Sequence, residues 1–236
     1  MTIKAVIFDI GGVVVGSPVA AISRAEREWG LPPHYLNGLI TAYGDEGAFQ
    51  RFERGQIEID EFYRQFGTQL SDVERGNDAY RKYCHRVGQE CPPLPKSLKV
   101  DGKDLWTRMM DPSLDPDPVV VTAINRLRAS GKYKIAALTN NFAPSGDVPS
   151  RYVSNGTFRP VSPRELAESL RRSARAHDEA KGSGDALLKS LFDEYVESCI
   201  EGVRKPDPRF YQIALDKLGI RGDEAVFLDD IGQLLT

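Results

Sequence analysis

A short apolar segment near the amino terminus ends in one carboxylate and a pair of glycines. Residues 5–8 are Ala-Val-Ile-Phe, and Asp9 and the glycines at 11–12 follow directly. Such a segment, bounded by turn residues, is typical of a fully buried strand. Open α/β sheets bind ligands beyond the carboxyl ends of their strands, and glycine allows a close approach to the backbone. Asp9 is therefore a candidate catalytic residue, although an isolated D-x-G-G is also compatible with an ordinary turn.

Further apolar segments repeat this pattern along the chain. Residues 134–138 are followed by a Thr-Asn pair, residues 225–228 by an Asp-Asp pair, and a weaker strand is expected over 194–198. Short apolar strands separated by helices predict an α/β fold with a Rossmann-like parallel sheet and helices on both faces. The polar residues that follow the strands should then meet at one edge of the sheet.

A helical block separates the first two strands. Its apolar residues recur at helical spacing, and Gly or Pro residues end several of the periodic segments. We expect a core of residues 1–16 and 111–236 and an inserted helical cap of residues 17–110. Phe49, Phe52 and Phe62 could line a pocket under that cap, but packing between the cap helices is the simpler explanation.

The composition changes between residues 143 and 184, which predicts a polar insert in the core. Residues 162–165 read Ser-Pro-Arg-Glu, a capping-box pattern with proline at the first helical position, so a polar surface helix should begin there.

Overall composition narrows the class of partners. The chain has 236 residues, 41% of them hydrophobic, and a formal net charge of −3, which gives no reason to expect nucleic acid or an anionic membrane as partner. We find no signal-peptide pattern and no membrane span. The three cysteines match neither a disulfide framework nor a zinc site, so a cytoplasmic location is expected. The sequence does not indicate an oligomeric state.

The strand-end residues and one lysine form the set of groups that phosphoryl transfer through a covalent intermediate needs. A carboxylate such as that of Asp9 can attack phosphorus and form an aspartyl phosphate. A hydroxyl and an ammonium, carried here by Thr139 and Lys205, can bind the phosphoryl oxygens, and the ammonium keeps the nucleophile ionised. The carboxylates of Asp229 and Asp230 can hold Mg²⁺, which prefers oxygen ligands. Each group alone has a simpler explanation, but their order and spacing together predict this chemistry.

The motifs resemble those of the haloacid dehalogenase-like hydrolase superfamily. They are D-x-G-G-V at 9–13, the strand ending in Thr-Asn at 139–140, K-P-D-P at 205–208 and the Asp pair at 229–230. Their surroundings are similar to the amino-terminal phosphatase domain of soluble epoxide hydrolases and of their acyl-CoA dehydrogenase-fused relatives. The helical block lies where that group has its cap.

The resemblance implies a Mg²⁺-dependent phosphatase that acts on a small phosphorylated substrate, and it implies a role for each motif residue. Asp9 would be the nucleophile and Lys205 the charge-balancing lysine. Phosphate would be bound by Thr139, Asn140 and Lys205. The metal would be bound by Asp9, the carbonyl of Gly11, Asp229 and Asp230.

Two departures from the family pattern bear on activity. Gly11 stands where most phosphatases of this family have an Asp that protonates the leaving group and activates water. General acid–base assistance of this kind contributes roughly 10²–10⁴-fold in rate, so good leaving groups should suffer least from its loss. The second departure is Leu234, where the family has Asn, followed by the end of the chain at Thr236. We therefore expect a final helix and edge strand to be missing.

Two alternatives to a phosphatase remain open from the sequence. The same Asp9 nucleophile could hydrolyse a carbon–halogen bond, a reaction that needs no metal and so leaves the acidic pair at 229–230 unexplained. Alternatively, a catalytically impaired or truncated member could act as a binding protein, which Gly11 and the expected loss of the final helix and strand both favour.

Overall fold

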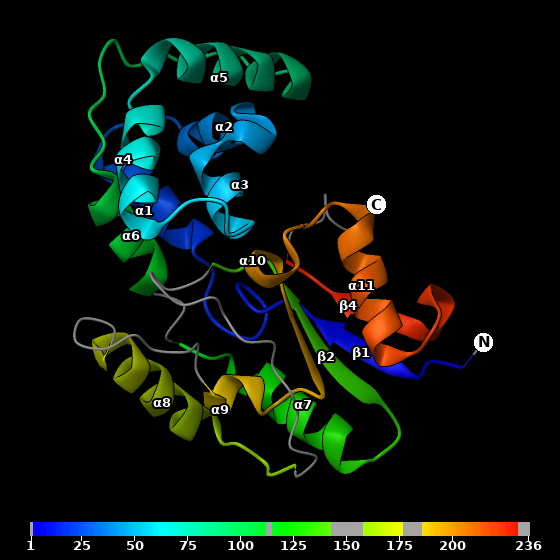
Figure 1. Ribbon diagram of the computed structural model, residues 1–236. Helices are drawn as coiled ribbons and strands as arrows, with labels where there is room; N and C mark the ends of the chain where they lie inside the picture. The colour runs from blue at the N-terminus through cyan, green and yellow to red at the C-terminus, as the bar shows by residue number, and fades with distance from the viewer. Residues whose placement is uncertain (1, 112–114, 143–157, 177–185, 231–236) are drawn as a thin grey trace. The chain divides into compact units, whose positions relative to one another are not determined.

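The computed structural model describes residues 2–111, 115–142, 158–176 and 186–230 (Figure 1). Contacts divide the chain into two compact units. The sheet unit comprises Met1–Gly16, Glu53–Gly55 and Ser113–Thr236, and the helical unit comprises Ser17–Phe52 and Gln56–Pro112.

A parallel sheet forms the centre of the sheet unit. Its strands are β1 (Ala5–Phe8), β2 (Lys134–Thr139), β3 (Glu194–Glu197) and β4 (Ala225–Leu228), in the spatial order β3-β2-β1-β4. All neighbouring pairs are parallel, which confirms the predicted α/β fold with a Rossmann-like sheet. In register, Phe8 pairs with Ala137 on one side and Leu228 on the other. The carboxyl ends of β1, β2 and β4 therefore lie at one edge of the sheet.

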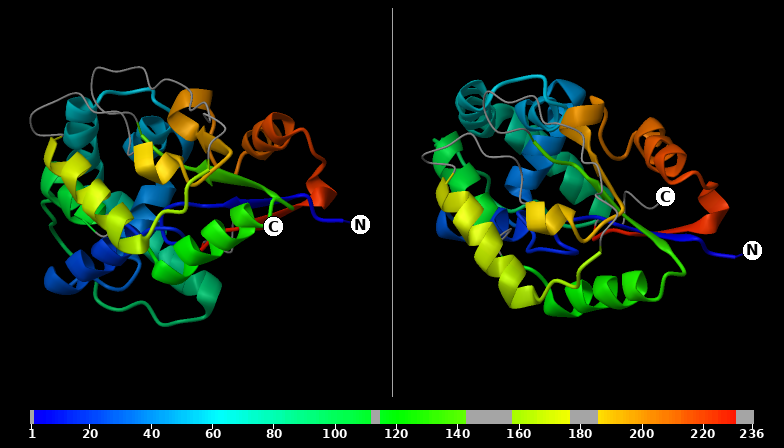
Figure 2. Two further views of the ribbon diagram at one scale, coloured as in Figure 1. Left: turned by 90° about the horizontal axis from the view of Figure 1, so that it is seen from below. Right: turned by 60° about the horizontal axis from the view of Figure 1, so that its bottom comes forward.

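Helices pack on both faces of this sheet (Figure 2). Alternate residues of β1 and β2 contribute to two hydrophobic clusters, as the period of a strand requires. One cluster contains residues of α7 (Pro118–Ala129), α8 (Pro163–Ala176) and α9 (Ala186–Lys189), and the other contains residues of α11 (Pro208–Leu218). The short helix α10 (Ser198–Glu201) follows β3, and the 3-10 turn η3 (Gly222–Glu224) precedes β4.

Local sequence explains where two of these helices begin. Asp117 caps α7 by accepting hydrogen bonds from the backbone N–H groups of Val119 and Val120, at 2.7 and 3.1 Å. Asp207 of the K-P-D-P motif caps α11 in the same way. In both helices proline occupies the first turn, where its missing N–H costs no hydrogen bond.

Most of the polar insert, residues 143–157 and 177–185, lies outside the described residues. Helix α8 begins at Pro163 as expected, and the Ser162 hydroxyl accepts the N–H of Glu165 at 3.1 Å. The predicted capping box is not completed, because the Glu165 carboxylate pairs with Arg159 instead.

Strand β4 lies at one edge of the sheet, and its Val226 and Leu228 are 39% and 41% exposed. Residues 231–236 lie outside the described residues, and with them the segment on which the expectation about the final helix and strand depended.

The helical unit contains α1 (Val19–Glu28), α2 (Tyr35–Ala42), the 3-10 turn η1 (Gly44–Glu46), α4 (Ile59–Leu70), α5 (Val73–Val87) and α6 (Gly102–Met110). Helix α3 (Ala48–Glu53) also belongs to it except for its last residue. Phe52 stacks on Phe62 with ring centroids 4.3 Å apart, and Trp106 meets both rings edge-on. These aromatic residues therefore form core, as the simpler explanation predicted. Among the described residues, no helix combines the length and the apolar character that crossing a bilayer requires.

Candidate active site

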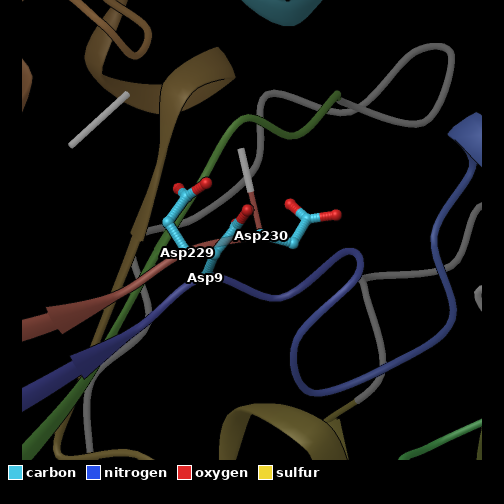
Figure 3. Close-up of side chains that lie close together, drawn as sticks. All are labelled: Asp9, Asp229 and Asp230. Carbon is cyan, nitrogen blue, oxygen red and sulfur yellow. The ribbon is translucent and has the colours of Figure 1, made fainter. Parts of the chain in front are cut away.

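Three aspartates gather at the carboxyl edge of the sheet (Figure 3). Asp9 follows β1, and its backbone N–H donates to the Leu228 carbonyl at 2.8 Å, which ties the end of β1 to the end of β4. Asp229 and Asp230 follow β4. One carboxylate oxygen from each aspartate lies within 4.8 Å of the others. The shared register of the strands thus brings together residues more than 200 positions apart.

The Lys205 side chain reaches this cluster from the loop between α10 and α11. Its Nζ lies 2.9 Å from Asp9 Oδ1 and 2.7 Å from Asp229 Oδ2. The lysine side chain is only 2% exposed, and its ammonium lies 5.3 Å from the centroid of the Phe227 ring. A buried ammonium needs charged partners, because its desolvation is otherwise too costly. The two carboxylates supply them.

The electrostatics of the cluster favour a bound divalent cation. Burial raises the pKa of Asp9 to about 6, although the nearby Lys205 ammonium acts to lower it. Burial and the neighbouring Asp229 charge also raise the pKa of Asp230. Three ionised carboxylates and one ammonium sum to a formal charge of −2. Carboxylate oxygens are ligands that Mg²⁺ prefers, so the donor set fits this ion in both chemistry and charge.

Gly12 leaves the space that one of these carboxylates occupies. Its φ is +84°, and a Cβ built on it would lie 2.0 Å from Asp230 Oδ2. Both the backbone conformation and the close approach therefore require glycine here. The neighbouring Gly11 lies in the same turn, in a bridge to Val15. Its carbonyl as a metal ligand stays a prediction.

Thr139 and Asn140 lie at the end of β2, as expected. Thr139 is 5% exposed. The Asn140 side chain binds the backbone of Lys205 twice: its Oδ1 accepts the Lys205 N–H at 2.8 Å, and its Nδ2 donates to the Lys205 carbonyl at 3.2 Å. Asn140 thereby holds the lysine loop against β2. That Thr139 and Asn140 bind phosphate stays a prediction.

Several polar residues beside the site belong to none of the motifs found in the sequence. Asn141 donates its N–H to the Ser198 hydroxyl at 2.9 Å and its Nδ2 to Glu197 Oε1 at 2.8 Å. Ser198 in turn donates to the Glu53 carbonyl at 2.5 Å, and Glu53 pairs with Arg204. The Glu-Ser pair at the end of the weak strand at 194–198 was the available signal, since it repeats the pattern of polar residues at strand ends.

Comparison with known proteins identifies a family. A family model described as haloacid dehalogenase-like hydrolase matches residues 3–232. The chain is 29% identical to acyl-CoA dehydrogenase family member 10 of Mus musculus, over 98% of this chain and 16% of that protein. It is 27% identical to bifunctional epoxide hydrolase 2 of Sus scrofa, over 100% of this chain and 34% of that protein. The chain thus spans about a sixth and a third of these two relatives.

A smaller relative and a solved structure are also similar to this chain. The sesquiterpene phosphatase astK of Aspergillus oryzae is 24% identical over 97% of this chain and 81% of that protein. The HAD family enzyme bt-2542 of Bacteroides thetaiotaomicron, solved with magnesium and inorganic phosphate, superposes with a TM-score of 0.52 at 15% identity. That alignment covers 98% of this chain and 87% of the other, and at this identity it shows the fold alone.

Proposed function

The chain belongs to the haloacid dehalogenase-like hydrolases, and from this membership we propose that it is a Mg²⁺-dependent phosphatase of small phosphomonoesters that acts through an aspartyl phosphate on Asp9. The observation that carries the proposal is the buried Lys205 ammonium, in contact with both Asp9 and Asp229. The phosphatase relative astK and the magnesium and phosphate bound by bt-2542 support it.

Asp9 supplies the nucleophile. Its Oδ1 accepts hydrogen bonds from the Ile10 N–H at 2.7 Å and from Lys205. These contacts hold Oδ1, so we assign the attack on phosphorus to Oδ2. A bond forms between Oδ2 and phosphorus, and the bond between phosphorus and the ester oxygen breaks. Water then attacks the aspartyl phosphate, which releases inorganic phosphate and regenerates the carboxylate.

Lys205 favours the ionised form of the Asp9 nucleophile. A buried carboxylate tends to take up a proton, and the pKa of Asp9 is raised by burial to about 6. The ammonium at 2.9 Å opposes that rise and stabilises negative charge on the transferring group. A Mg²⁺ ion held by Asp9, Asp230 and the Gly11 carbonyl, with Asp229 assisting, would offset the repulsion between carboxylate and phosphate.

Gly11 directs the choice of substrate within this proposal. It has no side chain that could protonate the leaving oxygen, an assistance worth roughly 10²–10⁴-fold in rate. Substrates with good leaving groups, such as aryl phosphates, acyl phosphates or sugar 1-phosphates, should therefore suffer least from the missing proton donor.

The test is release of inorganic phosphate from p-nitrophenyl phosphate by the purified chain with Mg²⁺. We expect release by the wild type and none by Asp9→Asn, which keeps the size of the side chain but is a far poorer nucleophile. Equal release by both proteins would exclude the proposal. Release of halide from a 2-haloacid in the presence of a chelator would favour a dehalogenase instead.

The absence of a proton donor at Gly11 also favours a second candidate function, a member of the family that binds a phosphorylated ligand without turnover. Such a protein would be stabilised against thermal unfolding by inorganic phosphate and Mg²⁺ together, and it would release no phosphate from aryl phosphates, acyl phosphates or sugar 1-phosphates.

A further inference from the structure

We propose that Glu53 is a positioning residue that acts through Arg204 to hold Lys205 between Asp9 and Asp229. This inference rests on the proposed function, because it assigns a role in placing the lysine of that site. Glu53 belongs to none of the strand-end motifs. It is the last residue of α3, and its contacts place it in the sheet unit.

Glu53 and Arg204 form an ion pair that is largely shielded from water. Arg204 Nε donates to Glu53 Oε2 at 2.6 Å, and the Arg204 and Glu53 side chains are 22% and 9% exposed. A pair so well shielded from water is far more costly to break than a surface pair, because either charge would be left buried and uncompensated. Arg204 directly precedes Lys205, so fixing its side chain restricts the backbone from which the catalytic lysine extends.

A second set of contacts reaches Lys205 from the other direction. The Glu53 carbonyl accepts the Ser198 hydroxyl at 2.5 Å, and the same hydroxyl accepts the Asn141 N–H at 2.9 Å. Asn140, next in the chain, binds the Lys205 backbone with both ends of its amide. Hydrogen bonds and peptide bonds thus form a closed ring through Glu53, Arg204, Lys205, Asn140, Asn141 and Ser198.

Gly55 shows how closely the turn after Glu53 packs against the backbone next to Ser198. Its φ is +67°, and a Cβ on it would lie 2.7 Å from the carbonyl oxygen of Cys199. The turn after Glu53 therefore packs directly on the backbone that follows Ser198. Glu53 is held from both its side chain and its backbone.

Such restraint matters because the lysine must satisfy two carboxylates at once. The contacts of Nζ with Asp9 and Asp229 are 2.9 and 2.7 Å, and a displacement of about 1 Å would break at least one of them. Misplacement of a catalytic group by this amount can cost about 10²-fold in rate. If Glu53 acts only by positioning Lys205 through Arg204, replacing Glu53 should have no further effect on kcat once Arg204 has been replaced.

The test measures kcat and KM for p-nitrophenyl phosphate with Mg²⁺ in Glu53→Ala, Glu53→Gln, Arg204→Ala and the Glu53→Ala/Arg204→Ala double variant. We expect a fall of roughly 10–100-fold in kcat with a smaller change in KM, as for other residues that orient a reacting group. Glu53→Gln, which can still accept from Arg204, should retain more activity than Glu53→Ala. The double variant should be no worse than the worse single variant.

The matched control is Asp193→Asn, which weakens the Arg128–Asp193 ion pair of the same unit, also 2.6 Å long. It should lower stability without lowering kcat. Wild-type kcat in both Glu53 variants, multiplicative losses in the double variant, or an equal loss of kcat in Asp193→Asn would overturn the proposal.

A crystal structure of Glu53→Gln, or of Glu53→Ala if it folds, separates this inference from the proposed function, because it needs no activity. We expect Lys205 Nζ to move away from Asp9 or Asp229. An unmoved Nζ overturns the positioning role whether or not the wild type is a phosphatase, whereas a displaced Nζ in a chain without phosphatase activity refutes only the proposed function.

Discussion

Replacing Gly12 with alanine should weaken Mg²⁺ binding, because the added Cβ would occupy the space of the Asp230 carboxylate. The Cβ would lie 2.0 Å from Asp230 Oδ2 and 2.5 Å from its Cγ, so that carboxylate or the turn must move. The backbone φ of +84° adds strain of about 1–3 kcal/mol for a residue other than glycine. Displacing a group at a metal site typically costs about 10–100-fold in affinity.

The assay is thermal unfolding of the purified chain over a range of Mg²⁺ concentrations, since the rise in stability with ligand concentration reports the dissociation constant. The matched control is Gly131→Ala, where φ is +64° but a Cβ would meet nothing within 4 Å. It should lose stability from backbone strain and keep wild-type Mg²⁺ binding. If Gly12→Ala also keeps wild-type Mg²⁺ binding, the assignment of Asp230 to the metal site is refuted.

Substitutions at four further residues should change activity or stability by measurable amounts. Lys205→Met should abolish phosphate release. It should also lower the free energy of unfolding, measured by urea titration, by about 3–5 kcal/mol, because two carboxylates lose their buried cation. An unchanged midpoint of urea unfolding would contradict this. Asp9 has a pKa raised from 3.8 to about 6, so in chelator its contribution to stability is present below pH 4 and is lost as the pH rises through 6. Asp9→Asn should therefore reduce the loss of stability between pH 4 and pH 7, measured by urea unfolding, and an unreduced loss would refute it. Phe62→Ala, in the aromatic core of the helical unit, should cost about 3–5 kcal/mol by the same measurement. Asp117→Ala should cost about 1 kcal/mol through loss of the α7 cap, against no change for a solvent-exposed control substitution, Lys132→Ala.

The meeting of the three aspartates was predictable from the sequence, because it depends on local patterns. An apolar segment followed by polar residues marks the carboxyl end of a strand, and parallel strands place these ends at one edge. The pattern therefore predicts that Asp9, Asp229 and Asp230 meet, and their carboxylate oxygens do lie close to one another. Strand β4 has the predicted bounds, while β2 is one residue longer and β3 one residue shorter than predicted.

Long-range polar pairing was not predictable in the same way. The Glu53–Arg204 pair joins residues 151 positions apart, and neither residue stands in a pattern that selects the other. The two hydrogen bonds from Asn140 to the Lys205 backbone likewise depend on how a loop folds back on a strand. Periodicity describes which face of an element is buried, but it carries no information on which buried charges become partners.

The first residue of one helix within the predicted helical cap does not follow the usual sequence pattern. Helix α6 begins with Gly102, a residue that normally indicates a helix end. Here glycine is required by packing, since a Cβ would lie 2.2 Å from the Tyr63 carbonyl oxygen. A close approach between helices thus placed a helix breaker at the start of a helix.

Detection of the covalent intermediate on Asp9 would test the proposed mechanism without relying on steady-state rates. Wild-type chain mixed with p-nitrophenyl phosphate and Mg²⁺ is quenched in acid and digested, and the peptides are examined by mass spectrometry. We expect one added phosphoryl group on the peptide that contains Asp9, lost on treatment with hydroxylamine, and none in Asp9→Asn. Release of phosphate by the wild type with the phosphoryl group absent from Asp9, or found on another residue, would contradict it.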